Sequence, residues 1–339
     1  MEYRTLGRSG LHVSVVGLGC NNFGMKTDKD AASVVVNKAI DAGITLFDTA
    51  NIYGGAGKSE EFLGAALAAR RPDVVVATKF SGPMGQGPLN RGAGRRHIFQ
   101  QVEASLRRLD TDYIDVYQMH RWDARTPIEE TLRALDDMVR SGKVRYVGCS
   151  NVSGWQVVEA AWTARTEHLT PFVSAQNQYN LLERGPQAEL IPACEKYGLG
   201  LLPYFPLASG FLTGKYRPGQ PAPEGTRLAN AAFARFTGNI LSEHNFDVLL
   251  KLEDFAKARG HTMLELAMSW LASQPVVASV IAGATRPEQV EENARSADWR
   301  LTAEEMKEID DIMGLTPPQM GFGGGRPPAG ARPAGSAPR

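Results

Sequence analysis

The sequence is poor in cysteine and has no excess of either charge. Its 339 residues include three cysteines, Cys20, Cys149 and Cys194, without a CxxC pair. Neither a disulfide framework nor a cysteine-based zinc site is therefore predicted, and the three are expected to be small buried apolar side chains. With 37 basic and 37 acidic residues the formal net charge is zero. That balance argues against nucleic-acid binding and against attachment to a membrane surface through basic residues.

The chain also lacks a signal-peptide pattern and an uninterrupted apolar segment of membrane-spanning length. Its first ten residues carry no apolar stretch of the kind found in signal peptides. The longest apolar segment, residues 262–284, is interrupted by Glu265 and by Gln274-Pro275. It is predicted to be a buried helix followed by a buried strand. A cytoplasmic protein without membrane contact is therefore expected.

The last 19 residues differ in composition from the rest of the chain. Residues 321–339 hold six Gly, four Pro, four Ala and three Arg, and no acidic residue. A segment of this composition has almost nothing to bury and is predicted to be disordered. We therefore expect a single folded domain over residues 1–320, followed by a disordered tail over 321–339.

Eight short apolar segments alternate with amphipathic helical segments. The apolar segments are residues 16–19, 44–47, 74–78, 113–119, 144–149, 172–175, 199–203 and 279–282. Most are continuously apolar, which is typical of parallel strands covered on both faces. Eight strand–helix units predict an α/β fold of the (β/α)8 TIM-barrel type, with a doubly wound sheet as the alternative.

Two segments depart from this repeat. Residues 2–15 precede the first barrel strand and are predicted to form a β-hairpin around Arg8-Ser9-Gly10. Residues 207–242, after the seventh strand, are rich in Gly, Pro and basic residues. A long irregular loop at that place lies on the catalytic face of a barrel, so a lid or ligand clamp is expected there.

A polar or ionisable residue follows most of the apolar segments. Asp48, Lys79 and His120 follow the second, third and fourth. The later segments lead into Ser150 and Asn151, Gln176, and Tyr204. Reactive groups of barrel enzymes come from these strand ends. Each residue alone also fits a structural role, such as a helix cap or a solvated lysine, but together they predict one polar site.

The residue types in this site suit proton transfer to a carbonyl group. Tyr53 lies five residues beyond Asp48 and can fold back over the site. Its phenol is a weak acid at neutral pH, and a Lys79 ammonium held by Asp48 is expected to lower its pKa. His120 can offer a hydrogen bond to a carbonyl oxygen. The site lacks the second carboxylate of a glycosidase, and His120 has no partner at metal-ligand spacing, so no metal is expected.

Several segments together resemble the motifs of the aldo-keto reductase superfamily. The segment from Asp48 to Gly54, DTANIYG, is similar to its first signature, and Lys79 and His120 match its catalytic lysine and histidine in order. Further matching segments are 148–151, 176–180, 206–210 with 214–215, and 283–285 with Gln289, Glu292 and Asn293. The resemblance covers residues 3–313 and is nearest to bacterial reductases related to potassium-channel β subunits.

This resemblance implies reversible reduction of an aldehyde or ketone by NAD(P)H without a metal. It makes Tyr53 the proton donor, assigns Lys79 and Asp48 to tune it, and has His120 orient the carbonyl. The implied cofactor residues are Ser150, Asn151, Gln176, Tyr204, Phe205, Pro206, Leu207, Ala208, Gly210, Lys215, Arg227, Gly283, Thr285, Arg286, Gln289, Glu292 and Asn293. Ser150, Asn151 and Gln176 would hold the carboxamide, and Tyr204 would stack on the nicotinamide.

The cofactor preference depends on cations that can reach a 2′-phosphate. Gly283 and Gln289 occupy the places where the better-known vertebrate reductases carry lysine and arginine, whereas Arg286 lies at the start of the final cofactor helix. We therefore expect NADPH to be preferred, with NADH possible.

Two other functions remain open. One is a cofactor-loaded redox sensor or auxiliary subunit with slow turnover, and the other is a Schiff-base enzyme with Lys79 as the nucleophile. The substrate and the oligomeric state are left open by these motifs.

Overall fold

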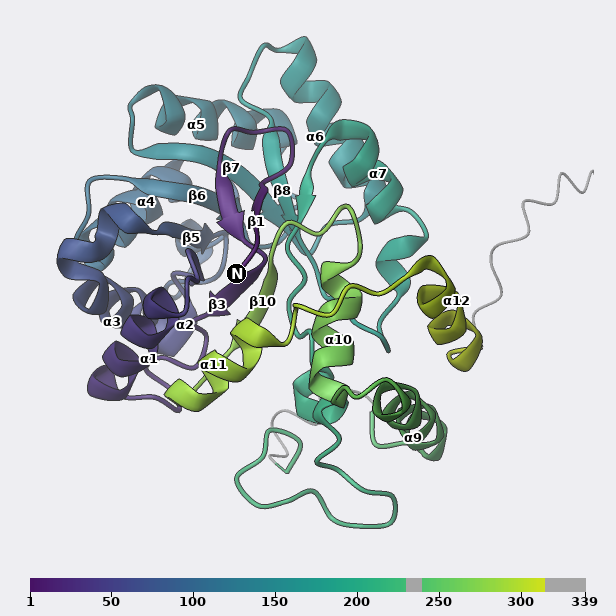
Figure 1. Cartoon of the computed structure of the whole chain (residues 1–339). Coiled ribbons are helices and arrows are strands. Elements are labelled where there is room, and N and C mark those ends of the chain that lie inside the picture. The colour runs from purple at the N-terminus through teal and green to yellow at the C-terminus, as the bar shows by residue number, and fades with distance from the viewer. Residues whose placement is uncertain (230–239, 315–339) are drawn as a thin grey trace, which may run out of the picture.

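Eight parallel strands form a curled sheet at the centre of the protein, with helices around it (Figure 1). The computed structural model describes residues 1–229 and 240–314. The strands, in the order in which they lie side by side, are β10 (Val280–Gly283), β3 (Val16–Gly19), β4 (Leu46–Asp48), β5 (Val75–Phe80), β6 (Ile114–Met119), β7 (Val144–Ser150), β8 (Phe172–Gln176) and β9 (Gly200–Leu201). Parallel bridges Leu201–Val277 and Tyr204–Ile281 bring the β9 and β10 edges together. The arrangement is consistent with the predicted (β/α)8 barrel.

Helices follow the strands and pack side by side around the sheet. Contacts join α1 to α3 and then each neighbour to the next as far as α7, while α1 also contacts α11. The described helices are α1 (Lys29–Asp41), α2 (Tyr53–Ala56), α3 (Lys58–Leu67), α4 (Arg95–Leu109), α5 (Ile128–Arg140), α6 (Gly154–Thr166), α7 (Leu190–Tyr197), α9 (Glu243–Ala258), α10 (Met263–Ala272), α11 (Pro287–Arg295) and α12 (Ala303–Ile312). Four short 3-10 helices are η1 (Ala68–Asp73), η2 (Pro88–Asn90), η3 (Gly185–Gln187) and η4 (Ala208–Thr213).

The predicted N-terminal hairpin is present and lies across one end of the sheet, in front of the strands in Figure 1. Its strands, β1 (Tyr3–Thr5) and β2 (His12–Ser14), pair antiparallel. Leu6 and Val13 are fully buried and pack with strand residues such as Leu46, Ala77 and Val116 in an apolar cluster. A larger apolar cluster lies between the sheet and the helices. The hairpin therefore closes one end of the sheet with apolar side chains, and the polar site lies at the other end.

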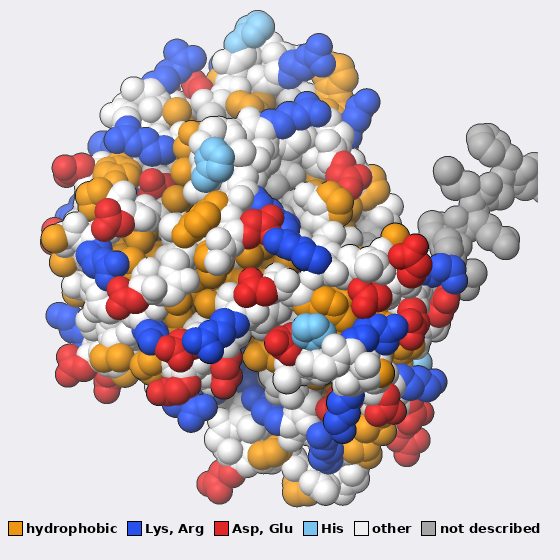
Figure 2. All heavy atoms as spheres, in the orientation of Figure 1, with side chains coloured by type: hydrophobic (Ala, Val, Ile, Leu, Met, Phe, Trp, Pro, Cys, Tyr) orange, Lys and Arg blue, Asp and Glu red, His pale blue; other side chains and the backbone are white. Residues whose placement is uncertain are grey.

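The surface and the cysteines agree with the composition of the chain. Basic and acidic side chains are interspersed over the face shown in Figure 2. Cys20, Cys149 and Cys194 are all buried with free thiols, which confirms the expectation that they serve as small apolar side chains. Among the described residues, no helix combines the length and apolar character needed to cross a bilayer.

The long segment after β9 begins with η4 and then projects from the body of the molecule in irregular conformation (Figure 1). The expected lid covers residues 207–242, of which 230–239 lie outside the described residues. The tail predicted over 321–339 also lies outside them. Its disorder, and the boundary of the domain at residue 320, stay predictions.

Candidate functional site

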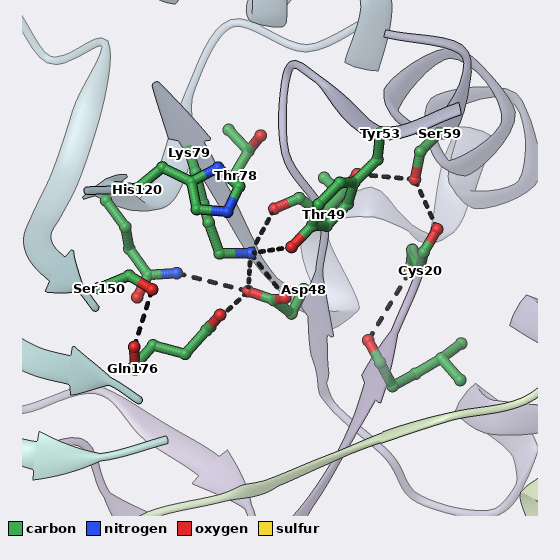
Figure 3. Close-up of polar contacts among 12 residues, drawn as sticks. Cys20, Asp48, Thr49, Tyr53, Ser59, Thr78, Lys79, His120, Ser150 and Gln176 are labelled. Atoms are coloured by element: carbon green, nitrogen blue, oxygen red, sulfur yellow. Dashed lines mark hydrogen bonds and ion pairs between the residues drawn. The ribbon is translucent and has the colours of Figure 1, made fainter. Parts of the chain in front are cut away.

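The alternation of side chains along the strands places a set of polar groups inside the sheet at one end. Residues two apart on a strand point to the same face. Leu46, Ala77 and Val116 belong to the interior apolar cluster. Two residues further along each strand come Asp48, Lys79 and Gln118, which are all buried, and Figure 3 shows Asp48 beside Lys79. The predicted Asp48 and Lys79 are thus the late residues of β4 and β5 and not the first residues of the loops.

Lys79 is the centre of this polar set. Its side chain is fully buried, and its Nζ donates to Asp48 Oδ1 at 2.8 Å and Oδ2 at 2.7 Å, and to the Thr49 carbonyl at 2.8 Å (Figure 3). Burial opposes the charged form, but Asp48 and then Tyr53 outweigh it, so the pKa of Lys79 is raised. The lysine is therefore held as an ammonium. A Schiff-base nucleophile needs a neutral amine, so the state of Lys79 does not fit that alternative.

Tyr53 lies within hydrogen-bonding reach of this ammonium. It begins the short helix α2, and Lys79 Nζ donates to its hydroxyl at 3.4 Å. The pKa of Tyr53 is raised from its ordinary value because burial outweighs the opposing effect of Lys79. Burial has the larger effect and raises this pKa, and Asp48 adds to the rise, while Lys79 lowers it through its charge and its hydrogen bond, in the direction expected.

His120 follows β6 directly and faces Tyr53. The two rings lie 5.7 Å apart, centre to centre, and are nearly perpendicular at 85°. Burial, and then the charges of Lys79 and Arg121, lower the pKa of His120 to about 3. The imidazole is therefore neutral at physiological pH. Its Nδ1 is buried without a hydrogen-bond partner in the described part of the chain.

The residues expected around a carboxamide bond to one another at the neighbouring strand ends. Ser150 Oγ donates to the Gln176 carbonyl at 2.7 Å, and Gln176 Nε2 donates to Asp48 Oδ1 at 2.7 Å. Asn151 Nδ2 donates to the His120 carbonyl at 2.9 Å, and the Tyr204 hydroxyl donates to Asn151 Oδ1 at 2.7 Å. These bonds link the ends of β6, β7, β8 and β9 into one polar rim around Tyr53 and His120.

Cationic side chains gather beside η4. Burial, and then the charges of Arg227 and Lys26, lower the pKa of Lys215. Arg227 lies over the Phe205 ring at 5.5 Å and donates to Asn22 Oδ1 at 3.3 Å. Asn22 belongs to the loop after β3. Because β10 lies between β9 and β3, the long loop after β9 passes the end of β10 to reach Asn22. Lys26 joins this cluster from the same β3 loop, a contribution that the sequence analysis did not identify.

The remaining predicted cofactor residues occupy three positions at the same end of the sheet. Phe205, Pro206 and Leu207 follow β9, and Ala208 and Gly210 lie in η4. Gly283 ends β10, and a Cβ there would lie 3.4 Å from the Asn22 side chain. The third position is the start of α11, where Gln289 Oε1 accepts from the Thr285 amide at 2.9 Å and Arg286 is the exposed N-terminal cap residue. Glu292 and Asn293 lie further along α11, with Glu292 exposed and Asn293 buried.

The sequence analysis missed two further residues of this site. Gln118 Nε2 lies 3.4 Å from Asp48 Oδ1 and completes the polar layer below Lys79. The sequence did carry a signal for Gln118: it lies two residues after the inward-facing Val116 on β6 and therefore faces the same side. Arg121 follows His120 directly, and its amide donates to Ser81 Oγ at 3.1 Å, so it lies in the loop at the end of β6. Within residues 1–229 and 240–314, no cluster of three or more His, Cys, Asp or Glu has metal-binding geometry.

Comparisons with known proteins agree with the motifs and the fold. The profile of the Aldo/keto reductase family matches residues 15–313. An uncharacterized oxidoreductase, YrpG of Bacillus subtilis, is 38% identical over 92% of this chain and 96% of its own length. A probable voltage-gated potassium channel subunit beta of Oryza sativa is 39% identical over 94% and 98%. The L-glyceraldehyde 3-phosphate reductase of Escherichia coli K12 is 36% identical over 91% and 92%.

Proposed function

Because the chain belongs to the aldo/keto reductase family, whose members carry out NAD(P)H-dependent oxidoreduction, we propose that it reduces aldehydes or ketones with Tyr53 as the proton donor. The observation that carries this proposal is the contact of the Tyr53 hydroxyl with a buried, charged Lys79 that Asp48 holds through both carboxylate oxygens. The Escherichia coli relative is named for the reduction of an aldehyde, which supports this substrate class.

Tyr53, Lys79 and His120 each have a separate role in the proposed carbonyl reduction. A bound reduced nicotinamide supplies the hydride. Tyr53, protonated because burial raises its pKa, donates a proton to the carbonyl oxygen. The adjacent Lys79 charge then stabilises the phenolate that remains. His120, neutral because its pKa is about 3, has a ring proton with which to hold the carbonyl oxygen near Tyr53.

The described residues fit a nicotinamide dinucleotide. After burial, the charges of Arg227 and Lys26 lower the pKa of Lys215 beside η4, and such a group of cations suits the negative charge of a diphosphate. Ser150, Asn151 and Gln176 supply hydroxyl and amide groups for a carboxamide, and Tyr204 supplies a ring for stacking. The bond from Arg227 to Asn22 supports a role for the long loop in covering the diphosphate.

This function is tested by following NADPH consumption with a panel of aldehydes and ketones. Steady consumption of one equivalent of NADPH per alcohol formed is the expected result. Tight NADPH binding without consumption would instead favour the sensor or auxiliary subunit, the alternative suggested weakly by the channel-subunit relatives. Trapping of a substrate on Lys79 by borohydride would contradict the proposal outright.

We also propose that Arg286 makes the protein prefer NADPH. Its exposed side chain lies at the N-terminus of α11, where helix dipole and guanidinium both favour an anion. A charge-assisted contact of this kind contributes about 1.5–3 kcal/mol, or roughly 10- to 150-fold in affinity. Dissociation constants are measured for both cofactors, and Arg286→Ala is expected to weaken NADPH binding by that factor and NADH binding little.

Arg295→Ala is the matched control, because Arg295 lies at the other end of the same helix. It is expected to leave both dissociation constants unchanged. Equal weakening of both cofactors by Arg286→Ala, or no preference in the unmodified protein, would show that Arg286 does not recognise a 2′-phosphate.

A further inference from the structure

The backbone directly after Tyr53 is left-handed over residues 54–57, with φ angles of +68°, +76°, +73° and +111°. Three of these residues are glycines, which enter this region readily but adopt other conformations just as readily. The short helix α2 gives little support, because it is non-helical at Gly54 and Gly55. The place of the Tyr53 hydroxyl therefore depends on the contacts that hold the chain on either side of residues 54–57.

On the N-terminal side, Asn51 attaches this segment to β5 and α4. The Asn51 amide donates to the Lys79 carbonyl at 3.2 Å, and Asn51 Nδ2 donates to Gln101 Oε1 at 3.0 Å. Both the Asn51 and the Gln101 side chains are buried. Since Gln101 belongs to α4, the chain that leads into Tyr53 is fixed to a strand of the sheet and to a helix outside it.

On the C-terminal side, Ser59 attaches the first turn of α3 to the ends of two strands. Its fully buried hydroxyl donates to the Cys20 carbonyl at 2.7 Å and shares a hydrogen bond with the Thr49 hydroxyl at 2.8 Å (Figure 3). Thr49 is the residue whose carbonyl accepts from Lys79 Nζ. The start of α3 is therefore joined to the chain that follows β3 and β4.

The next residue, Glu60, forms a buried ion pair outside the sheet. Its side chain is fully buried, Thr78 Oγ1 donates to Glu60 Oε1 at 2.6 Å, and Arg108 Nε donates to Oε2 at 2.6 Å. Thr78 directly precedes Lys79 on β5. Because side chains alternate along a strand, Thr78 faces the helices while Lys79 faces the interior. Glu60 therefore connects α3 to the strand that carries Lys79.

Arg108 also packs against the end of the left-handed segment. A Cβ at Gly57 would lie 2.4 Å from Arg108 Cδ, so the backbone of Gly57 lies directly against this side chain. The Arg108 side chain is only 16% exposed. Because Arg108 and Gln101 both belong to α4, this helix contacts the chain on both sides of the left-handed segment.

We infer that the ion pair between Glu60 and Arg108 positions Tyr53 for proton transfer, by holding residues 54–57 at a fixed place relative to β5. This inference rests on the proposed function, because proton donation by Tyr53 is the step that it serves. The contact from Lys79 Nζ to the Tyr53 hydroxyl is 3.4 Å long, beyond the usual range for a hydrogen bond. A further displacement of a fraction of an ångström would end it. Glu60 and Arg108 thus act through the backbone, as positioning residues.

Glu60→Gln keeps the shape of the side chain and removes its charge. It is expected to lower kcat by about 10- to 100-fold, the effect of a misplacement of about 1 Å at a reacting group. The KM for the carbonyl and the NADPH dissociation constant are expected to change by less than about threefold, because only the proton transfer is affected. Rates are expressed per NADPH-binding site, so that a smaller folded fraction does not count as lost activity.

The same substitution in the Tyr53→Phe variant separates positioning from a general structural role. If the ion pair acts through the Tyr53 hydroxyl, Glu60→Gln has nothing more to displace there, and its further effect on kcat is expected to stay below about twofold. An equal loss in both backgrounds, or no loss in either, would overturn the inference.

Asp115→Asn is the matched control for the loss of a buried charge. Asp115 pairs with Arg71 at 2.7 Å, with side chains that are 13% and 8% exposed, and accepts from the Val76 amide at 2.9 Å. It lies near the start of β6, whereas His120 follows the end of that strand. This variant is expected to leave kcat per binding site unchanged. A loss as large as that of Glu60→Gln would also overturn the inference.

Amide hydrogen exchange over residues 51–58 provides a measurement that needs no turnover. Exchange there is expected to be faster in Glu60→Gln and unchanged in Asp115→Asn. If the unmodified protein shows no turnover, this result still supports the positioning by Glu60, and the proposed function alone is contradicted. Unchanged exchange in Glu60→Gln would overturn the inference. Should Glu60→Gln fail to fold, its combination with Arg108→Gln removes both charges, and the same expectations apply to it.

Discussion

Tyr53→Phe is expected to reduce carbonyl reduction by about 10²–10⁴-fold, the usual contribution of a general acid. The substitution removes the hydroxyl that Lys79 Nζ contacts at 3.4 Å and keeps the ring that packs edge-on against His120. Cofactor affinity is expected to change little, because the proposed cofactor residues lie on other strand ends. Steady-state rates and NADPH dissociation constants measure the two effects separately.

Tyr117→Phe provides a matched control for the loss of a buried tyrosine hydroxyl. Tyr117 lies on β6, packs against Phe80, and its hydroxyl has no hydrogen-bond partner within the described residues. Its removal is expected to leave turnover unchanged. Near-normal turnover in Tyr53→Phe would refute the assignment of the proton donor, whereas equal losses in both variants would point to a general effect on the fold.

Lys79→Met is expected to abolish most activity and to move the pH dependence of reduction. In the proposed mechanism, reduction needs the protonated phenol and is expected to fall as pH rises through the pKa of Tyr53. Lys79 lowers that pKa against the larger opposing effect of burial. Without the lysine the pKa rises further, so the alkaline limb of reduction moves to higher pH while the weaker acid reacts more slowly at neutral pH. Rate profiles from neutral to strongly alkaline pH measure this shift.

Lys79→Met also leaves the Asp48 carboxylate buried without its cation, and a loss of this kind typically costs about 3–5 kcal/mol of stability. Asp48→Asn combined with Lys79→Met removes both charges and keeps the test informative if the single variant fails to fold. Lys79 affects the pKa of Tyr53 more than Asp48 does, so the double variant should shift the alkaline limb in the same direction by a smaller amount. An unshifted limb with a modest loss of rate would mean that Lys79 is only structural.

The strand ends were predicted with an error of one or two residues. This error did not change which residues were predicted to form the site. The apolar run for β4 ends at Phe47, but the strand includes Asp48, and β5 extends through Lys79 to Phe80. Hydrophobicity marks the buried part of a strand, whereas backbone pairing continues into polar residues at its end. The residues predicted to meet therefore do meet, inside the sheet and not above it.

The protonation states could not be read from the order of residues. Sequence reasoning gave the direction in which Lys79 acts on the pKa of Tyr53, but not that burial has the larger, opposite effect. Neither did the motifs indicate Gln118, whose amide reaches Asp48 only because both strands direct these side chains to the interior of the sheet.

The sequence by itself determined the repeating strand–helix order, the N-terminal hairpin, the family and the set Asp48, Lys79 and His120, because apolar periodicity and motif order are local properties. Only the tertiary structure decided which way each strand faces and how deeply each polar group is buried. It brought the Gln118 amide to Asp48 and lowered the pKa of His120 by burial. These properties depend on distances between residues far apart in the chain, and on the water that packing excludes from between them.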